Sequence, residues 1–114
     1  MALKIKRIYE PAVDDDGFRV LVDRLWPRGL SKKKAGVDLW LKDVAPSAEL
    51  RKWFNHDQEK FVEFRKKYEG ELSDNDALAS LKETVKEHQT VTLLYSAKSE
   101  DMNQAVILRQ LLQP

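Results

Sequence analysis

The chain has 114 residues, a length typical of one domain with its own hydrophobic core, and its lack of cysteine excludes disulfides, thiolate catalysis and cysteine-ligated zinc. Its formal net charge of +1 argues against a generally basic nucleic-acid-binding surface, and no apolar run is long enough for a signal peptide or a membrane span. We therefore expect a single domain over residues 1–114, located in the cytoplasm and not in a membrane.

Two strands are expected first, over residues 3–9 and 18–23. Partial alternation of apolar and basic residues indicates the first strand, whereas the continuous apolar run at residues 20–22 is typical of a strand covered on both faces. Turn-forming Asp and Gly residues at 14–17 separate the two strands. The link is too short for an ordinary crossover, so the strands either form an antiparallel hairpin or are not neighbours.

Helices and a third strand follow. Apolar residues or natural capping residues indicate a short turn over residues 32–35 and helices over residues 48–54, 58–71, 76–88 and 100–112. Residues 90–95 are rich in β-formers and predict the third strand, and Ser99 is the expected N-cap of the last helix. Because a long helical connection between two strands suits a parallel crossover, we predict an α/β fold. It has a small, mainly parallel sheet of three or four strands flanked by about five helices.

The main candidate site lies where two predicted strands end. The second strand runs into Asp23 and Arg24, and the third runs into Tyr95 and Ser96. In open α/β sheets, ligands bind beyond the carboxyl ends of parallel strands, so these segments meet if the two strands are parallel neighbours. Lys98 and the free N–H groups before the last helix lie on the same rim and suit an anion. We expect a small ligand bearing phosphate or carboxylate, a nucleotide-like molecule being one candidate.

Individual roles follow from side-chain chemistry. Arg24 and Arg28 are guanidinium groups in a proline-stiffened loop, and such groups bind phosphate or carboxylate bidentately. Asp23 is the candidate catalytic base if it is buried near a ligand. Alternatively, Asp23 pairs with one of the two arginines and holds the loop. Trp26 either covers a ligand ring or fills the core, and the core is the favoured role.

A second possible anion site lies at the start of the helix that follows Ser47, with Lys42 before it and Arg51 on its next turn. The N-cap role explains Ser47 fully, however. His56 and His88 are interpreted as surface, capping or other structural residues. No metal-ligand spacing, Walker A loop or glycine-rich dinucleotide motif occurs, so no metal and no cofactor is expected.

Several blocks resemble a known family. Residues 20–31 (VLVDRLWPRGLS), 39–47 (LWLKDVAPS), 50–54 (LRKWF) and 91–98 (VTLLYSAK) are similar to the YeaO-like branch of the domain-of-unknown-function family 488. The resemblance covers nearly the whole chain and implies a compact α/β domain, with no established activity to carry over. Residues matching the family motif are Asp23, Arg24, Trp26, Pro27, Arg28, Gly29, Lys42, Ser47, Arg51 and Tyr95.

The chain departs from larger relatives of that family in two places. Those relatives have a helix between the first two strands and a Cys-His-Arg stretch that opens the last helix. This chain has only Glu10 to Gly17 in the first place and Met102-Asn103-Gln104 in the second. Cysteine-dependent chemistry of such relatives therefore does not transfer to this chain.

The first functional hypothesis is an enzyme or a binding domain for a small anionic molecule. Arg24 and Arg28 would hold the anion, Asp23 would orient it or accept a proton, and Tyr95 would donate a hydrogen bond. The alternatives are a nucleic-acid-binding module, based on the basic segment 19–34, and an interaction protein that docks a partner on its Trp-Pro loop. The sequence leaves the oligomeric state and the presence of catalysis open.

Overall fold

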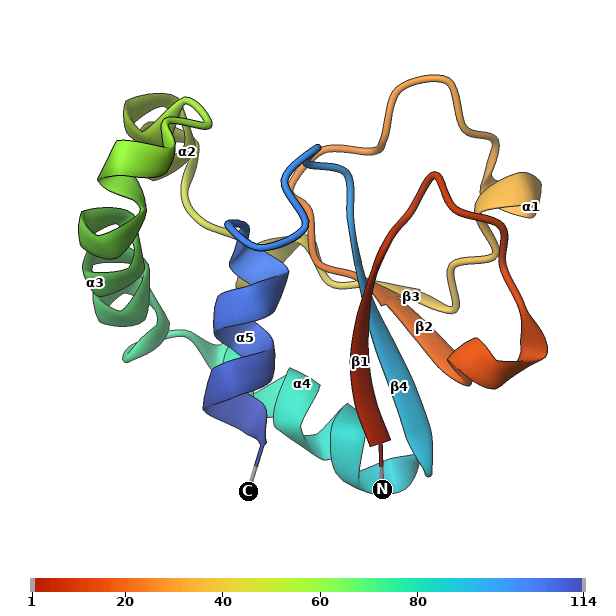
Figure 1. Ribbon diagram of the computed structural model, residues 1–114. Coiled ribbons are helices and arrows are strands. Elements are labelled where there is room, and N and C mark those ends of the chain that lie inside the picture. The colour runs from red at the N-terminus through yellow and green to blue at the C-terminus, as the bar shows by residue number, and fades with distance from the viewer. Residues whose placement is uncertain (1, 114) are drawn as a thin grey trace.

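The centre of the protein is a sheet of four parallel strands, seen in a computed structural model that describes residues 2–113 (Figure 1). The strand order is β1-β4-β2-β3, and all three pairings are parallel. The strands are β1 (Ala2–Arg7), β2 (Phe18–Leu21), β3 (Leu39–Trp40) and β4 (Thr90–Tyr95). The predicted α/β class with a small parallel sheet is confirmed. Met1 and Pro114, the end residues of the predicted domain, lie outside the described residues.

The strand ends differ slightly from the prediction. The strands expected over residues 3–9 and 18–23 are shorter in the structure. Beyond each strand, one further N–H group donates to β4. Ile8 donates to the carbonyl oxygen of Tyr95 at 2.8 Å, and Val22 donates to that of Leu94 at 3.1 Å. β3 was missed because two residues are too few for a periodic pattern to show.

The connection between β1 and β2, residues 8–17, passes from one side of β4 to the other, since β4 lies between the two strands. They are therefore not neighbours, which settles the question that the sequence left open. A 3-10 turn, η1 (Asp14–Asp16), closes the connection, and Gly17 follows with a φ of 65°. A Cβ atom at Gly17 would lie 2.3 Å from the carbonyl oxygen of Thr90, so only glycine fits where the connection meets β4.

Asp16 anchors this connection from a buried position, with 5% of its surface exposed. Its carboxylate accepts hydrogen bonds from the Lys6 ammonium and the Val13 N–H, both at 3.1 Å, and from the Arg19 guanidinium. Burial raises the pKa of Asp16, but these bonds outweigh burial, and the net pKa lies below the ordinary value. Arg19 also donates to two carbonyl oxygens at the end of helix α1 (Lys32–Ala35), at 2.9 and 3.0 Å. This arginine is therefore structural.

Within residues 2–113 there are five α-helices in the predicted order; those at residues 32–35 and 48–54 have the predicted bounds, and the ends of the later three differ. The remaining ones are α2 (Ala48–Phe54), α3 (Phe61–Leu72), α4 (Asp76–Glu87) and α5 (Gln104–Leu112), with short 3-10 turns η2 (Lys42–Val44) and η3 (Gln58–Lys60). The helix predicted over residues 58–71 is divided into η3 and α3. The last helix begins later than predicted, because Asn103 and not Ser99 accepts its N-cap hydrogen bond, at 3.1 Å. Ser99 instead accepts from the Met102 N–H, at 3.1 Å, and closes the preceding turn.

The two faces of the sheet are covered differently. On one face, strand residues such as Val20 and Leu93 join the side chains of α2 to α5 in the main core. On the other face, a smaller cluster around Leu21 is covered by α1 and by the half-buried side chains of Trp26 and Trp40. Both faces of β2 are covered, so its residues Val20 and Leu21 are apolar, as the sequence indicated. The polar residue of β2 is Arg19, which bonds to Asp16 of the connection.

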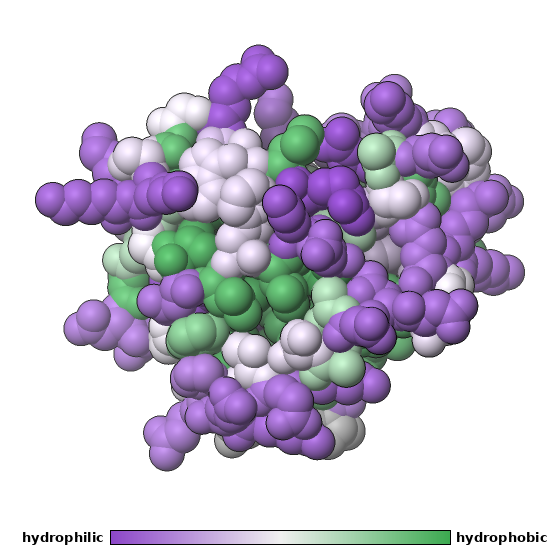
Figure 2. Space-filling model, turned by 180° about the vertical axis from the view of Figure 1, so that it is seen from behind, coloured by the Kyte–Doolittle hydropathy of each residue, from purple (hydrophilic) through white to green (hydrophobic). Residues whose placement is uncertain are grey.

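The surface seen from behind carries a central group of apolar side chains surrounded by hydrophilic ones (Figure 2). Apolar atoms make up more than half of the accessible surface of ordinary folded proteins, so such a group does not by itself mark a site. Along residues 2–113 no helix combines the length and the hydrophobicity needed to cross a bilayer.

Candidate functional site

The ends of β2 and β4 bring predicted site residues together. The two strands are parallel neighbours, with Leu21 opposite Leu94, and their carboxyl ends lie at the end of the molecule away from the chain termini (Figure 1). Just beyond the strands, the Ser96 N–H donates to Oδ2 of Asp23 at 3.0 Å. The convergence of the two strand ends, on which the predicted site depended, is therefore confirmed.

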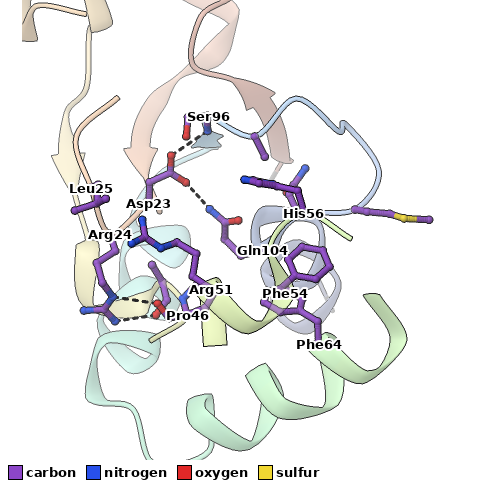
Figure 3. A pocket seen from close by; sticks show the side chains of 14 residues that line it. Asp23, Arg24, Leu25, Pro46, Arg51, Phe54, His56, Phe64, Ser96 and Gln104 are labelled. Carbon is purple, nitrogen blue, oxygen red and sulfur yellow. Dashed lines mark hydrogen bonds between the residues drawn. The ribbon is translucent and has the colours of Figure 1, made fainter. Parts of the chain in front are cut away.

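A cavity of about 150 Å³ lies beside these strand ends, and we call it the inner chamber (Figure 3). Asp23, Ser96 and Gln104 form its polar side, and the rings of Phe54 and Phe64 lie on another side. The two rings stack with their centroids 4.2 Å apart. The remaining lining residues are Arg24, Leu25, Ala45, Pro46, Arg51, His56, Ala97, Met102 and Asn103. The inner chamber is thus a small, largely apolar space with one polar side.

Asp23 is the carboxyl group of the inner chamber, with 8% of its surface exposed. Oδ2 accepts from the Ser96 N–H and Oδ1 accepts from Nε2 of Gln104. Burial raises the pKa of Asp23, and the hydrogen bonds from Ser96 and Gln104 and the charge of Arg51 lower it only in part. The pKa therefore lies above the ordinary value. No ion pair involving Asp23 is present within residues 2–113.

Arg24 holds the loop after β2 by bonds to the backbone. Its Nε donates to the carbonyl oxygen of Pro46 at 3.0 Å and its Nη2 to that of Ala45 at 3.1 Å (Figure 3). The alternative in which Asp23 pairs with Arg24 or Arg28 is therefore not the arrangement in the structure. Arg24 lines the inner chamber, but the protein itself uses two of its N–H groups.

A wider depression of about 930 Å³, which we call the outer cleft, lies next to the inner chamber and shares lining residues with it. The residues that line both are Leu25, Arg51, Phe54, His56, Ser96, Ala97 and Met102. The cationic residues of the outer cleft are Arg7, Arg28, Arg51 and Lys98, and none of its described lining residues is Asp or Glu. Charges of one sign on a concave surface focus the electric field and attract the opposite charge, so the outer cleft is suited to anions.

Aromatic side chains form part of the outer cleft wall. Nε1 of Trp26 donates to the carbonyl oxygen of Leu30 at 2.7 Å, and its ring meets that of Trp40 edge-on at 5.4 Å. Trp26 therefore belongs to the smaller core cluster, the role that the sequence favoured, and it also lines the cleft. The Tyr9 hydroxyl donates to the carbonyl oxygen of Arg28 at 2.9 Å, which ties the Trp-Pro loop to the end of β1.

His56 lies where the inner chamber joins the outer cleft. It is exposed, in agreement with its interpretation as a surface histidine, but its place on the cleft wall was not foreseen. Asn55 and His56 have φ values of 46° and 56°. Two successive non-glycine residues in the left-handed region are uncommon, and such conformations cluster at functional sites.

Three of the predicted ligand-binding residues lie outside both the inner chamber and the outer cleft. Tyr95 is 2% exposed and belongs to the main core, because side chains alternate along β4 and this one faces the helices. Ser47 accepts the N-cap bond of α2 and donates to the Glu71 carboxylate at 2.5 Å, so Glu71 occupies the second predicted anion site. Lys42 lies over the ring of Trp40, with 5.6 Å between the ammonium and the ring centroid.

Gln104 is the site residue that the sequence analysis missed. It is the first residue of α5, and it joins the site only because that helix begins beside the ends of β2 and β4. One signal was present in the sequence: Gln104 is part of the stretch that stands where larger relatives have Cys-His-Arg. Phe54 and Phe64 were predicted only as core residues, since a stripe of aromatic residues on a helix is usually core.

The groups present define what the site can do chemically. Within residues 2–113, no three His, Cys, Asp or Glu side chains gather as metal ligands. The outer cleft offers positive charge and N–H donors, and the inner chamber offers a carboxyl group and an amide beside apolar rings. The arrangement is therefore suited to binding by charge, hydrogen bonds and ring contacts.

The fold and this site define a small parallel α/β domain with a buried carboxyl group next to a cationic cleft. A sequence model of the family described as "Inactive DUF488-N3 subclade" matches residues 2–114, and the chain belongs to this family. It is 42% identical to "Uncharacterized protein YeaO" of Escherichia coli (strain K12) over 108 residues, which are 95% of this chain and 94% of that protein. The YeaO-like resemblance is thus confirmed.

Mycobacterial proteins are similar over the same extent. The chain is 44% identical to "Uncharacterized protein Rv3073c" of Mycobacterium tuberculosis (strain ATCC 25618 / H37Rv) over 110 residues, which are 96% of this chain and 92% of that protein. The same identity and coverage hold for "Uncharacterized protein Mb3100c" of Mycobacterium bovis (strain ATCC BAA-935 / AF2122/97). No solved structure matches the chain.

Proposed function

We propose that the protein binds a small anionic ligand, bearing phosphate or carboxylate, in the outer cleft, and that it does so without catalysing a reaction. The observation that carries the proposal is the set of four cationic side chains around one concave surface. Within residues 2–113, the side chains of Arg28, Arg51 and Lys98 take part in no ion pair. Guanidinium groups that the protein does not use are free to bind phosphate or carboxylate bidentately.

Three observations support binding without catalysis. The family is described as inactive. The chain has no cysteine to act as a nucleophile. Both oxygens of Asp23, the predicted catalytic base, already accept hydrogen bonds from Ser96 and Gln104. We therefore assign Asp23 to ligand recognition in this proposal. The cytoplasmic location expected from the sequence belongs to the same proposal and stays a prediction.

The structure weakens the support for the two alternative functions, a nucleic-acid-binding module and an interaction protein that docks a partner on its Trp-Pro loop. In the basic segment 19–34, Arg19 is bonded to Asp16 and Arg24 to backbone carbonyl groups, so neither is available to a nucleic acid. Trp26 is half-buried beside a cleft, whereas a partner-docking loop would present it free of any cleft. Both alternatives stay predictions, and the observations favour the small ligand.

Calorimetry at low ionic strength tests the proposal. Inorganic phosphate, sugar phosphates, nucleoside monophosphates and small carboxylates are titrated into the protein, with their uncharged counterparts as controls. We expect at least one anion to bind, and Arg28→Ala to weaken it about tenfold or more, which corresponds to ~1.4 kcal/mol. Lys82→Ala removes the same charge from the exposed surface of α4 and is expected to change nothing. Equal affinities for the two variants, or no binding by any anion, would contradict the proposal.

A further inference from the structure

The inner chamber identifies the class of ligand more closely, and this inference rests on the function proposed above. We propose that the anion bound in the outer cleft carries a single six-membered ring with N–H donors, as a pyrimidine nucleotide does. The inner chamber holds that ring, with its N–H edge against Asp23 and Gln104 and its apolar surface against the stacked pair of Phe54 and Phe64.

The size of the inner chamber limits the ring. Its volume is about 150 Å³, and an apolar cavity of about this volume in another protein accommodates benzene. One six-membered ring therefore fits the chamber, whereas the fused double ring of a purine is larger than benzene. The chamber and the outer cleft share lining residues and are therefore adjacent, which lets one molecule place its ring in the chamber and its anionic group in the cleft.

The apolar side of the chamber suits a flat ring. Phe54 and Phe64 are 7% and 3% exposed, and their planes lie 20° apart. The two rings lie next to each other on one side of the chamber (Figure 3). Aromatic surfaces bind other rings by offset stacking or edge-to-face contact, which adds to the gain from burial.

The polar side of the chamber selects hydrogen-bond donors. A carboxylate offers about four acceptor positions, and the structure uses one on each oxygen of Asp23, for Ser96 and for Gln104. Because Gln104 directs its amide nitrogen at Asp23, its amide oxygen remains as a second acceptor. In Figure 3 both side chains lie on the same side of the chamber, opposite the phenylalanine rings. A ring edge with N–H groups satisfies these acceptors, whereas a ring without donors leaves them unpaired.

The charges of the outer cleft then bind the anionic group. Arg51 lines both spaces, and its guanidinium extends toward Asp23 in Figure 3. Arg28 and Lys98 line only the outer cleft. The two spaces therefore have different roles. The outer cleft attracts any phosphate, and the inner chamber selects among rings.

Calorimetry with three ligands separates these contributions: ribose 5-phosphate, cytidine 5′-monophosphate and guanosine 5′-monophosphate. We expect the cytidine nucleotide to bind at least tenfold more tightly than ribose 5-phosphate, and the guanosine nucleotide to gain less than threefold. Asp23→Asn keeps the size of the side chain and removes acceptor capacity. Ala97→Leu fills the chamber and leaves Asp23 intact, so it serves as a second variant if Asp23→Asn folds poorly. In each variant the gain from cytosine is the ratio of its affinities for cytidine 5′-monophosphate and ribose 5-phosphate, and we expect this ratio to fall to about one.

The possible outcomes are distinct. If ribose 5-phosphate binds and cytosine adds nothing, or guanine adds as much as cytosine, the ring assignment is wrong while anion binding in the outer cleft stands. If neither ribose 5-phosphate nor either nucleotide binds, this inference is wrong, and the proposed function falls with it only if inorganic phosphate and the small carboxylates also fail to bind. If both variants keep the cytosine gain, the ring lies outside the inner chamber and the assignment is again overturned.

Discussion

Asp16 and Asp23 are two buried carboxyl groups in the same small domain, with 5% and 8% of their surface exposed, yet their surroundings differ. Asp16 is bonded to the cations of Lys6 and Arg19, and its pKa is lowered despite burial. Asp23 accepts hydrogen bonds from an amide and a backbone N–H, lies beside a cavity, and has its pKa raised by burial. A carboxylate paired with internal cations is structural, whereas one left facing a cavity is available to a ligand.

The largest expected effect is on stability. Asp16→Asn removes the charge that Arg19 and Lys6 share, and breaking a buried ion pair in this way costs about 3–5 kcal/mol. Asp23→Asn removes no ion pair, so its effect on the free energy of unfolding should stay within about 1 kcal/mol. Chemical denaturation of both variants measures the difference. Similar losses for the two variants would remove the contrast between the two carboxyl groups.

A second effect concerns the arginines of the Trp-Pro loop. Arg24→Ala leaves the carbonyl groups of Ala45 and Pro46 without their donor, and hydrogen bonds from charged groups contribute about 1.5–3 kcal/mol each. Arg28→Ala is the matched control, since its side chain makes no such bond, and its unfolding free energy should change by less than about 0.5 kcal/mol. The expected pattern is that Arg24→Ala lowers stability, whereas Arg28→Ala lowers only anion affinity.

A third, smaller effect on stability is expected at Ser47, without an effect on anion binding. Ser47→Ala removes the N-cap of α2 and the bond to Glu71, so we expect a loss of about 1 kcal/mol in unfolding free energy. The affinity for the anion should stay unchanged, because neither space of the site is lined by Ser47. Thermal denaturation and calorimetry on the same sample check both points, and a lowered affinity would return the start of α2 to the list of candidate sites.

The pH dependence of stability should have opposite signs for the two carboxyl groups. The pKa of Asp16 in the folded state is below its ordinary value of 3.8, so its contribution to stability is present above pH 3.8 and is lost as the pH falls through the lowered pKa. The pKa of Asp23 is above 3.8, so the folded state keeps the proton of Asp23 to a higher pH than the unfolded state does. Stability therefore falls as the pH rises from 3.8 through the raised pKa. Relative to the natural protein, Asp23→Asn should therefore gain stability as the pH rises above 3.8, and Asp16→Asn should not. Denaturant titrations at several pH values measure both trends.

The smallest effect is expected at Lys42. Its ammonium lies over Trp40, outside both spaces of the site, so Lys42→Ala should change anion affinity less than twofold. Lys98→Ala removes an equal charge from the outer cleft and should weaken binding several-fold. Comparing the two variants at two salt concentrations shows whether the charge that matters lies in the cleft.

Sequence reasoning succeeded where a feature depends on local pattern. The strand at Thr90–Tyr95 and the convergence of its end with Asp23 follow from composition and the rules for parallel sheets. It failed where the outcome depends on distant segments. Nothing near Tyr95 reveals that its side chain faces the helices, and nothing near Gln104 reveals that α5 begins beside β2. Nothing near Ser47 reveals that Glu71, from another helix, accepts the hydrogen bond of its hydroxyl group.

The most direct test of the central claim is an NMR titration of the ¹⁵N-labelled protein with inorganic phosphate at low ionic strength. If the outer cleft binds anions, we expect saturable chemical-shift changes in the amides of residues 96–102 and in the guanidinium signals of Arg28 and Arg51. The signals of Asp16 and its neighbours should stay unchanged. Shifts confined to the lysines of α1, or no saturable shift at any residue of the outer cleft, would contradict the claim that this cleft binds anions.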